Sequence, residues 1–184
     1  TEHINADLYL SAPAEKAPLI IFLHGHDNSK EDHAYQAMHL ATWGMHSLAL
    51  QLPNKGSWVG NGWTLARIVD FIYRRPGIID SRIDVNRIIL VGHSFGGSSV
   101  AIALAEGAPA AGSILLDPAG VGKDLPQFLR QVNKPVMLLG ADEQVSSTLN
   151  RGYFYSGLFQ RTSRENATSR IARDGGIQNQ YRGC

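Results

Sequence analysis

Short runs of apolar residues alternate along this chain with segments whose apolar residues recur at helical spacing. The continuous apolar runs are typical of strands buried on both faces, as in a parallel sheet. One further segment, near the amino terminus, alternates with a period of two and predicts an edge strand. The sequence therefore predicts buried strands within 19–23, 45–52, 88–91, 113–116 and 135–139, and an edge strand over 4–10.

Helices are predicted between these strands. Ser29, with Asp32 three residues later, has the pattern of a capping box, and Gly44 fits the end of the helix that follows. A glycine-containing loop over 53–62 precedes a helix from about Trp63 to Arg75. The sequence predicts a buried face of Ala66, Val69, Ile72 and Tyr73 for that helix, and further helices directly after Ser94, over 125–132 and over 145–159.

A single helix between two buried strands requires a crossover connection, which favours parallel strands. The fold class predicted is therefore α/β, a three-layer sandwich with a mainly parallel sheet. The chain has 184 residues, 43% of them hydrophobic, which suits one core rather than two. We expect one α/β domain over 1–159 and a polar, arginine-rich tail over 160–184 without regular structure.

Charge and composition narrow the range of partners. A formal net charge of +1 gives no reason to expect nucleic acid or an anionic membrane surface, and no apolar run is long enough to span a bilayer. The single cysteine, Cys184, rules out an internal disulfide. The compartment stays open: cytoplasmic, or secreted or periplasmic if a leader precedes Thr1. No dinucleotide fingerprint or metal-ligand set is present, so we expect neither a cofactor nor a metal.

The strongest chemical motif is Gly92-His93-Ser94-Phe95-Gly96, which joins an apolar strand to an alanine-rich helix. This is the G-x-S-x-G pattern of a nucleophile elbow, in which strand and helix approach so closely that small neighbours are required. The turn presents the serine hydroxyl at the carboxyl end of the sheet and at a helix N-terminus, where negative charge is favoured. Ser94 is therefore the candidate nucleophile.

A second motif, Leu23-His24-Gly25-His26-Asp27, follows another buried strand at the same edge of the sheet. Acyl transfer places negative charge on the former carbonyl oxygen, which two backbone N–H groups must then stabilise. The N–H of Phe95 is one candidate donor and that of His26 is the other, with Gly25 letting the backbone turn inward. Trp58, Trp63 and Phe95 are candidates for the walls of the substrate pocket.

With these motifs in this order, the segment 19–143 resembles the α/β-hydrolase superfamily, in particular its small lipase, esterase and dienelactone-hydrolase-like members. The resemblance implies a cofactor-free serine hydrolase acting on a small-molecule carboxylic ester. It also implies an acid at the end of a later strand. Asp117 has the Asp-Pro setting of some lipases and of chlorophyllases, whereas Asp142, or its neighbour Glu143, ends the following strand, where many other members keep theirs.

The family's general base is a histidine on a loop after the last strand, and this chain departs from that pattern. Its histidines are His3, His24, His26, His33, His39, His46 and His93, so none follows Ser94. We therefore expect a C-terminally incomplete fold, with the usual last part absent or replaced from Gln160 onward. Two functions remain: an impaired serine esterase, or a non-catalytic member that binds a ligand or partner. The oligomeric state does not follow from the sequence.

Overall fold

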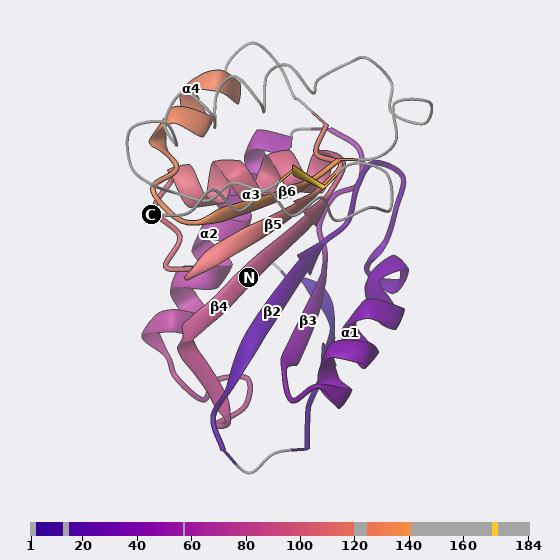
Figure 1. The fold of residues 1–184 in the computed structure, drawn as a ribbon, viewed down its shortest axis with the longest axis vertical. Helices are drawn as coiled ribbons and strands as arrows, with labels where there is room; N and C mark the ends of the chain where they lie inside the picture. Colours follow the sequence, from indigo (N-terminus) through magenta and orange to yellow (C-terminus); the bar gives the residue numbers. More distant parts are fainter. Residues whose placement is uncertain (1–2, 13–14, 57, 120–124, 141–170, 173–184) are drawn as a thin grey trace, which may run out of the picture.

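The structure is a computed structural model, and it describes residues 3–12, 15–56, 58–119, 125–140 and 171–172. Its centre is a twisted sheet in which seven strands lie in the order β1-β3-β2-β4-β5-β6-β7 (Figure 1). Strand β1 is antiparallel to β3, and every other neighbouring pair is parallel. The strands are β1 (Asn5–Tyr9), β2 (Ala17–Leu23), β3 (His46–Gln51), β4 (Ile83–His93), β5 (Gly112–Leu116), β6 (Val136–Leu139) and β7 (Ile171–Ala172).

Helices cover both faces of the sheet, which confirms the predicted three-layer α/β sandwich. Helix α1 (Ala34–Thr42) covers one face, where Ala37 packs against Phe22 and Val91. Three helices cover the other face, and their buried residues share one apolar cluster with the sheet. They are α2 (Trp58–Arg74), α3 (Phe95–Ala105) and α4 (Leu125–Gln131).

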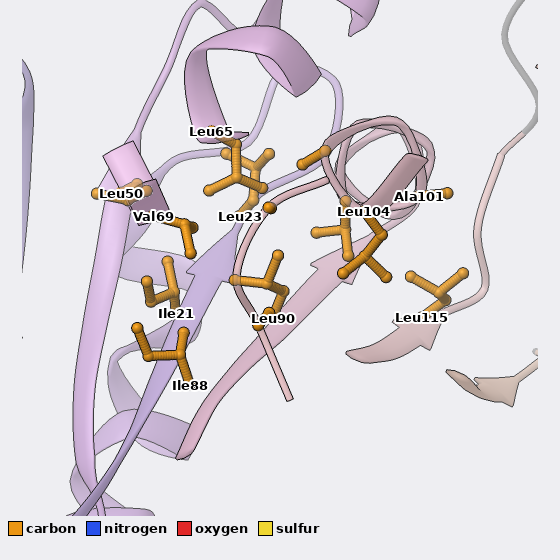
Figure 2. Close-up of a cluster of buried hydrophobic side chains, with 14 of the residues drawn as sticks. Ile21, Leu23, Leu50, Leu65, Val69, Ile88, Leu90, Ala101, Leu104 and Leu115 are labelled. Atoms are coloured by element: carbon orange, nitrogen blue, oxygen red, sulfur yellow. The ribbon is translucent and has the colours of Figure 1, made fainter. Parts of the chain in front are cut away.

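The larger part of the core lies between the central strands and helices α2 and α3 (Figure 2). Leu23 of β2 and Leu90 of β4 are completely buried, and Leu65 of α2 packs into the same cluster. Burying an aliphatic side chain of this size stabilises a fold by about 1.5–3 kcal/mol. The continuous apolar runs of the sequence therefore correspond to strands with helices on both sides.

Helix α1 begins and ends as the sequence predicts. The Ser29 N–H donates to the Asp32 carboxylate over 2.9 Å, and a short 3-10 turn, Lys30–His33, leads into the helix. The chain leaves the helix at Gly44, whose φ of +82° is one that residues with a side chain rarely adopt.

Helix α2 begins at Trp58, so the prediction of a loop over 53–62 and a helix from Trp63 was wrong. Two of the three glycines that suggested a loop, Gly60 and Gly62, lie within the helix. A Cβ atom at Gly62 would lie 2.6 Å from Cγ2 of Ile102, so a side chain there would separate α2 from α3. Close helix packing has overridden the low helix propensity of glycine.

The buried face of α2 also differs in part from the prediction. Val69 and Ile72 are buried as expected, whereas Tyr73 is 40% exposed. Strand β4 is longer than the predicted apolar run and begins at Ile83. Its first part is polar, and Arg87 Nε donates to the Asp84 carboxylate over 2.7 Å.

At the carboxyl-terminal side, Ile171 and Ala172 pair in parallel with Leu138 and Leu139 of β6. These two residues fall inside the segment for which no regular structure was predicted. The helix predicted over 145–159 lies outside the described residues. Within the described part of the chain, no helix is long and apolar enough to cross a membrane.

Candidate active site

Strands β2, β4 and β5 end side by side at one edge of the sheet, because Leu23 pairs with Gly92 and Gly92 pairs with Leu115. In the described residues, three non-glycine residues have a positive φ, and each lies just beyond one of these strands. They are Asp27 (54°), Ser94 (51°) and Asp117 (39°). Strained backbone of this kind costs on the order of 1–3 kcal/mol per residue and clusters at functional sites.

Ser94 lies in the sharp turn between β4 and α3, with φ of 51° and ψ of −123°. The turn is fixed on both sides: the Ser94 N–H donates to the Leu116 carbonyl over 2.9 Å, and the Ser94 carbonyl accepts from the Gly97 N–H over 2.9 Å. Ser94 is partly exposed, and helix α3 begins at the next residue. The backbone is therefore that of the predicted nucleophile elbow.

The glycines of the motif allow backbone to pack directly on backbone. A Cβ atom at Gly92 would lie 2.4 Å from the carbonyl oxygen of Gly96. One at Gly96 would lie 2.4 Å from the carbonyl oxygens of Leu23 and His24. No side chain fits at either position, which gives the G-x-S-x-G spacing its steric reason.

The loop after β2 passes directly over the serine. A Cβ atom at Gly25 would lie only 3.0 Å from Cβ of Ser94. The next N–H groups of the loop are bonded, that of Asp27 to the Asn54 carbonyl (3.3 Å) and that of Asn28 to the Gly25 carbonyl (3.4 Å). Among the described residues, the N–H groups of His26 and Phe95 have no hydrogen-bond acceptor. Both belong to segments that meet at Ser94.

An aromatic cluster lies beside the elbow. The rings of Trp58 and Phe95 are stacked, with centroids 5.3 Å apart and planes inclined by 15°, and the His26 ring lies edge-on to both. Trp58 is only 4% exposed, and its carbonyl accepts a hydrogen bond from the Ser99 hydroxyl over 2.9 Å. Trp58 is therefore the buried ring of the cluster, against which Phe95 and His26 pack.

Trp63, the other tryptophan considered for the pocket wall, does not belong to this cluster. It is half-exposed, and its indole N–H donates to Glu106 over 3.2 Å. Glu106 follows the far end of α3, so Trp63 lies toward the opposite edge of the sheet from Ser94. Helix α2 therefore brings Trp58, and not Trp63, beside the elbow. The pocket role of Trp63 stays a prediction.

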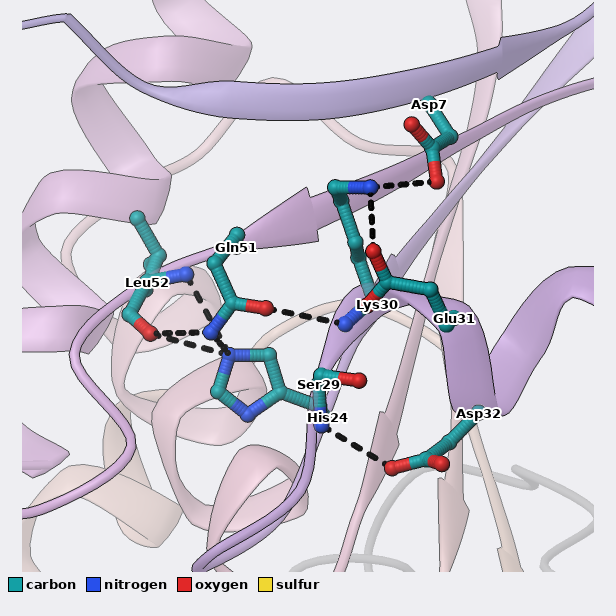
Figure 3. A network of polar contacts seen from close by, with 8 residues as sticks. All are labelled: Asp7, His24, Ser29, Lys30, Glu31, Asp32, Gln51 and Leu52. Carbon is teal, nitrogen blue, oxygen red and sulfur yellow. Dashed lines mark hydrogen bonds and ion pairs between the residues drawn. The ribbon is translucent and has the colours of Figure 1, made fainter.

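The histidines nearest the elbow are held in different ways. The His24 ring is buried and bonds to the carbonyl of Gly25. It also bonds to the backbone of Leu52 (Figure 3). His26 is half-exposed, with Nε2 3.4 Å from the Asp27 carboxylate. His33 is buried and stacked on Phe22; burial, and next the nearby His93, lower its pKa to about 4. Within the described residues, no hydrogen bond joins a histidine ring to the Ser94 hydroxyl.

The two candidate acids differ in how far the structure describes them. Asp117 follows β5, and its N–H donates to the Leu139 carbonyl over 2.6 Å. The loop that it opens lies against the elbow, because the Ala119 N–H donates to the Ser94 carbonyl over 3.0 Å. Asp142 lies outside the described residues. In the part of the chain that is described, no three His, Cys, Asp or Glu side chains are grouped as metal ligands would be.

Comparison with solved structures identifies the fold. Esterase 2 of Thermogutta terrifontis phosphorylated by paraoxon superposes with a TM-score of 0.68 at 15% identity, covering 93% of this chain and 76% of that one. The native form of the same esterase gives 0.65 at 15% identity, with coverages of 92% and 75%. The 2,6-dihydroxy-pseudo-oxynicotine hydrolase gives 0.67 at 15% identity, with coverages of 85% and 54%. At such identities the likeness shows a shared fold.

No curated protein sequence matches the chain. The model of the alpha/beta hydrolase family matches residues 20–178, which include the elbow, the loop after β2 and all of the strands from β3 to β7. The match extends beyond 19–143, the segment in which the motifs alone carry the resemblance. From this match and from the architecture described above, the chain belongs to the alpha/beta hydrolase family.

Proposed function

We propose that the protein is a serine hydrolase that cleaves carboxylic esters by acyl transfer through Ser94. The observation that carries the proposal is the strained backbone of Ser94 together with two neighbouring N–H groups, those of His26 and Phe95, that have no acceptor in the described residues. Such N–H groups can stabilise an oxyanion that forms beside the serine.

In this reaction the Ser94 oxygen attacks the ester carbonyl carbon, and the carbonyl oxygen becomes an oxyanion that accepts hydrogen bonds from the His26 and Phe95 N–H groups. The serine gives its proton to water, and the alkoxide leaves when the carbonyl re-forms and takes up a proton from water to become the alcohol. Water then attacks the acyl carbon, and cleavage of the acyl–serine bond releases the acid and returns a proton to Ser94. Loss of one oxyanion donor typically lowers kcat by about 10²–10³-fold. The loop and the elbow therefore provide the electrostatic part of catalysis.

The described residues provide less for proton transfer from Ser94 than for stabilising the oxyanion. A serine hydroxyl is a poor nucleophile without a positioned base, and the sequence contains no histidine after His93. In enzymes that lose a triad member, about 10³–10⁴-fold catalysis over water remains from oxyanion stabilisation and binding. We infer an activity of this order, with Asp117 or Asp142 as the acid that the family would pair with a base. Esters whose leaving group departs without a proton are the best substrates.

The aromatic cluster indicates the acyl or alcohol group that the site accepts. Phe95 and His26 present ring surface beside Ser94, and Trp58 supports them. Rings favour apolar and aromatic partners through area burial and edge or stacked contacts. We infer an ester with an apolar or aromatic group, held without a metal or cofactor.

The test combines turnover with labelling. Purified protein is incubated with p-nitrophenyl butyrate, and separately with a fluorophosphonate that labels activated serines. Organophosphorus reagents are suitable because the similar Thermogutta terrifontis esterase 2 is phosphorylated by paraoxon. We expect slow turnover and labelling in the unchanged protein and in Ser81→Ala, an exposed serine control, and loss of both in Ser94→Ala. Equal rates in all three proteins would contradict the proposal.

A second function has one observation in its favour, the absence of a histidine after His93. A non-catalytic member of the family would bind an apolar ligand or a partner at the same edge of the sheet. Such a protein would show saturable quenching of its tryptophan fluorescence when an ester binds. It would neither cleave the ester nor be labelled by the fluorophosphonate. Labelling that depends on Ser94 excludes this alternative.

A further inference from the structure

We propose that His24 is a positioning residue, which sets the direction of the His26 N–H by holding the carbonyl of Gly25. The inference rests on the proposed function, because it gives that N–H its place in the oxyanion site. His24 itself is 1% exposed and touches no substrate. Its effect on the reaction passes through one peptide group.

The peptide between Gly25 and His26 carries both groups concerned. Nδ1 of His24 lies 2.9 Å from the carbonyl oxygen of Gly25. The carbonyl and the N–H of a trans peptide point in opposite directions within one plane. A carbonyl held toward the His24 ring therefore turns the His26 N–H away from that ring.

The protonation of the ring follows from its neighbours. Each ring nitrogen lies 2.9 Å from a carbonyl oxygen, Nδ1 from that of Gly25 and Nε2 from that of Leu52. A neutral ring carries one proton, and the inference places it on Nδ1, because Nε2 also faces two donors, the Leu52 N–H and the Gln51 amide. In the neutral ring Nε2 is then an acceptor, and it takes the N–H of Leu52 over 3.2 Å. The Leu52 carbonyl, 2.9 Å from Nε2, accepts a hydrogen bond from the Gln51 side-chain amide over 3.0 Å.

The ring is fixed by residues from outside the loop (Figure 3). Gln51 and Leu52 lie at the end of β3, and Nε2 of Gln51 is 3.0 Å from Nε2 of His24. The other end of the Gln51 amide accepts from the Lys30 N–H over 3.0 Å. The direction of the Gly25 carbonyl is therefore tied to the neighbouring strand.

The carbonyl of Gly25 depends on this hydrogen bond more than that of another residue would. A residue without Cβ has the widest choice of backbone conformation, and a Cβ at Gly25 would lie only 3.0 Å from Cβ of Ser94. The only other donor to the Gly25 carbonyl in the described residues is the Asn28 N–H, at the longer distance of 3.4 Å. Without the imidazole, only this longer bond holds the Gly25 carbonyl, and the peptide can turn the His26 N–H away from Ser94.

The test compares two substitutions, each of which keeps a polar group at the place of one ring nitrogen of His24. In His24→Asn, the amide nitrogen can stand where Nδ1 stands and donate to Gly25. In His24→Gln, the amide reaches toward Leu52 and the donor to Gly25 is lost. Both variants remove the imidazole from the core, so stability measured by urea unfolding serves as the control.

We expect fluorophosphonate labelling of Ser94 to fall by about 10²-fold in His24→Gln, the usual effect of losing one oxyanion donor, and by less than tenfold in His24→Asn. The labelling rate would then follow the Gly25 bond rather than stability. Equal losses in the two variants, or losses that follow their unfolding free energies, would overturn the positioning role.

Two further measurements separate this inference from the proposed function. In crystal structures of the unchanged protein and of both variants, we expect the Gly25 carbonyl to turn away from residue 24 in His24→Gln alone; an unchanged carbonyl in that variant overturns the inference. If neither variant folds, ¹⁵N NMR of the unchanged protein decides, because the inference requires a proton on Nδ1 of His24. Absence of Ser94 labelling in the unchanged protein would remove the proposed function, while the carbonyl direction would still decide the role of His24.

Discussion

The backbone of Gly25 lies against the side chain of Ser94, with only 3.0 Å between a Cβ built on the glycine and the serine Cβ. The loop after β2 and the elbow after β4 are therefore one packed unit, although almost seventy residues separate them in the sequence. Any change in this contact alters the place where an oxyanion would form.

Replacing Gly25 by alanine tests that contact. The added methyl also lies 3.3 Å from Nδ1 and from the carbonyl oxygen of His93, so the loop must move away from Ser94. We expect the Ser94 labelling rate to fall by about 10²-fold, as for loss of an oxyanion donor. The matched control is Gly107→Ala, which has open space around it and should leave the rate unchanged.

Replacing Gly96 by alanine tests the packing of the elbow through stability. Its methyl would lie 2.4 Å from two backbone carbonyl oxygens, which cannot move as a side chain can. We expect a loss of more than about 2 kcal/mol in the free energy of unfolding, as for a strongly overpacked core. Gly107→Ala should lose about 1–2 kcal/mol, since only its φ of +84° opposes a side chain. Equal losses, measured by urea unfolding, would show that the elbow is loosely packed.

Added imidazole should accelerate the reaction if the chain lacks its own base. The hydroxyl of Ser94 has no hydrogen bond from a histidine ring in the described residues, so a base from solution can take its proton. We expect p-nitrophenyl butyrate turnover by the unchanged protein to rise with imidazole more steeply than turnover by Ser94→Ala. The reverse finding, no acceleration together with loss of activity in His26→Gln or His93→Gln, would assign the base to the chain itself.

His33 should make stability depend on pH. Burial lowers its pKa from 6.5 to about 4, so the unfolded chain binds a proton there at pH values where the folded chain does not. Above about pH 6.5 His33 is neutral in both states and does not reduce the free energy of unfolding. As the pH falls to about 4, proton binding to the unfolded chain lowers that free energy by about 3 kcal/mol at most. In His33→Phe, which keeps a ring on Phe22, this part of the acid destabilisation should be missing.

The check is the difference in unfolding free energy between the unchanged protein and His33→Phe, measured from pH 7.5 to pH 4. Other groups that titrate in both proteins cancel in this difference. We expect the variant to gain relative stability as the pH falls. A difference that stays constant over the range would mean that His33 is hydrated in the folded state.

The sequence was sufficient for the elbow because its requirements are local and steric. Gly92 and Gly96 have no room for a Cβ. With an apolar strand before them and a helix after them, they form a sequence pattern that few other local structures can satisfy. The buried strands were equally predictable, because a strand covered on both faces must be continuously apolar. The same reasoning failed at Gly62, whose role depends on Ile102 in another helix.

The site contains features that have no sequence signal. His24 and His26 are both polar residues after a strand, yet one is buried among backbone groups and the other is half-exposed beside Phe95. Asp27 adopts a positive φ, which nothing in its neighbours requires. These differences depend on Leu52, Gln51 and Asn54, which reach the loop only when β2 and β3 are paired.

The most direct measurement is a crystal structure of the protein after reaction with a fluorophosphonate. The account predicts a phosphonyl group bonded to Oγ of Ser94, with its oxygen about 2.7–3.1 Å from the nitrogen atoms of both His26 and Phe95. A phosphonyl oxygen that points into solvent, or an adduct on any residue other than Ser94, would contradict it.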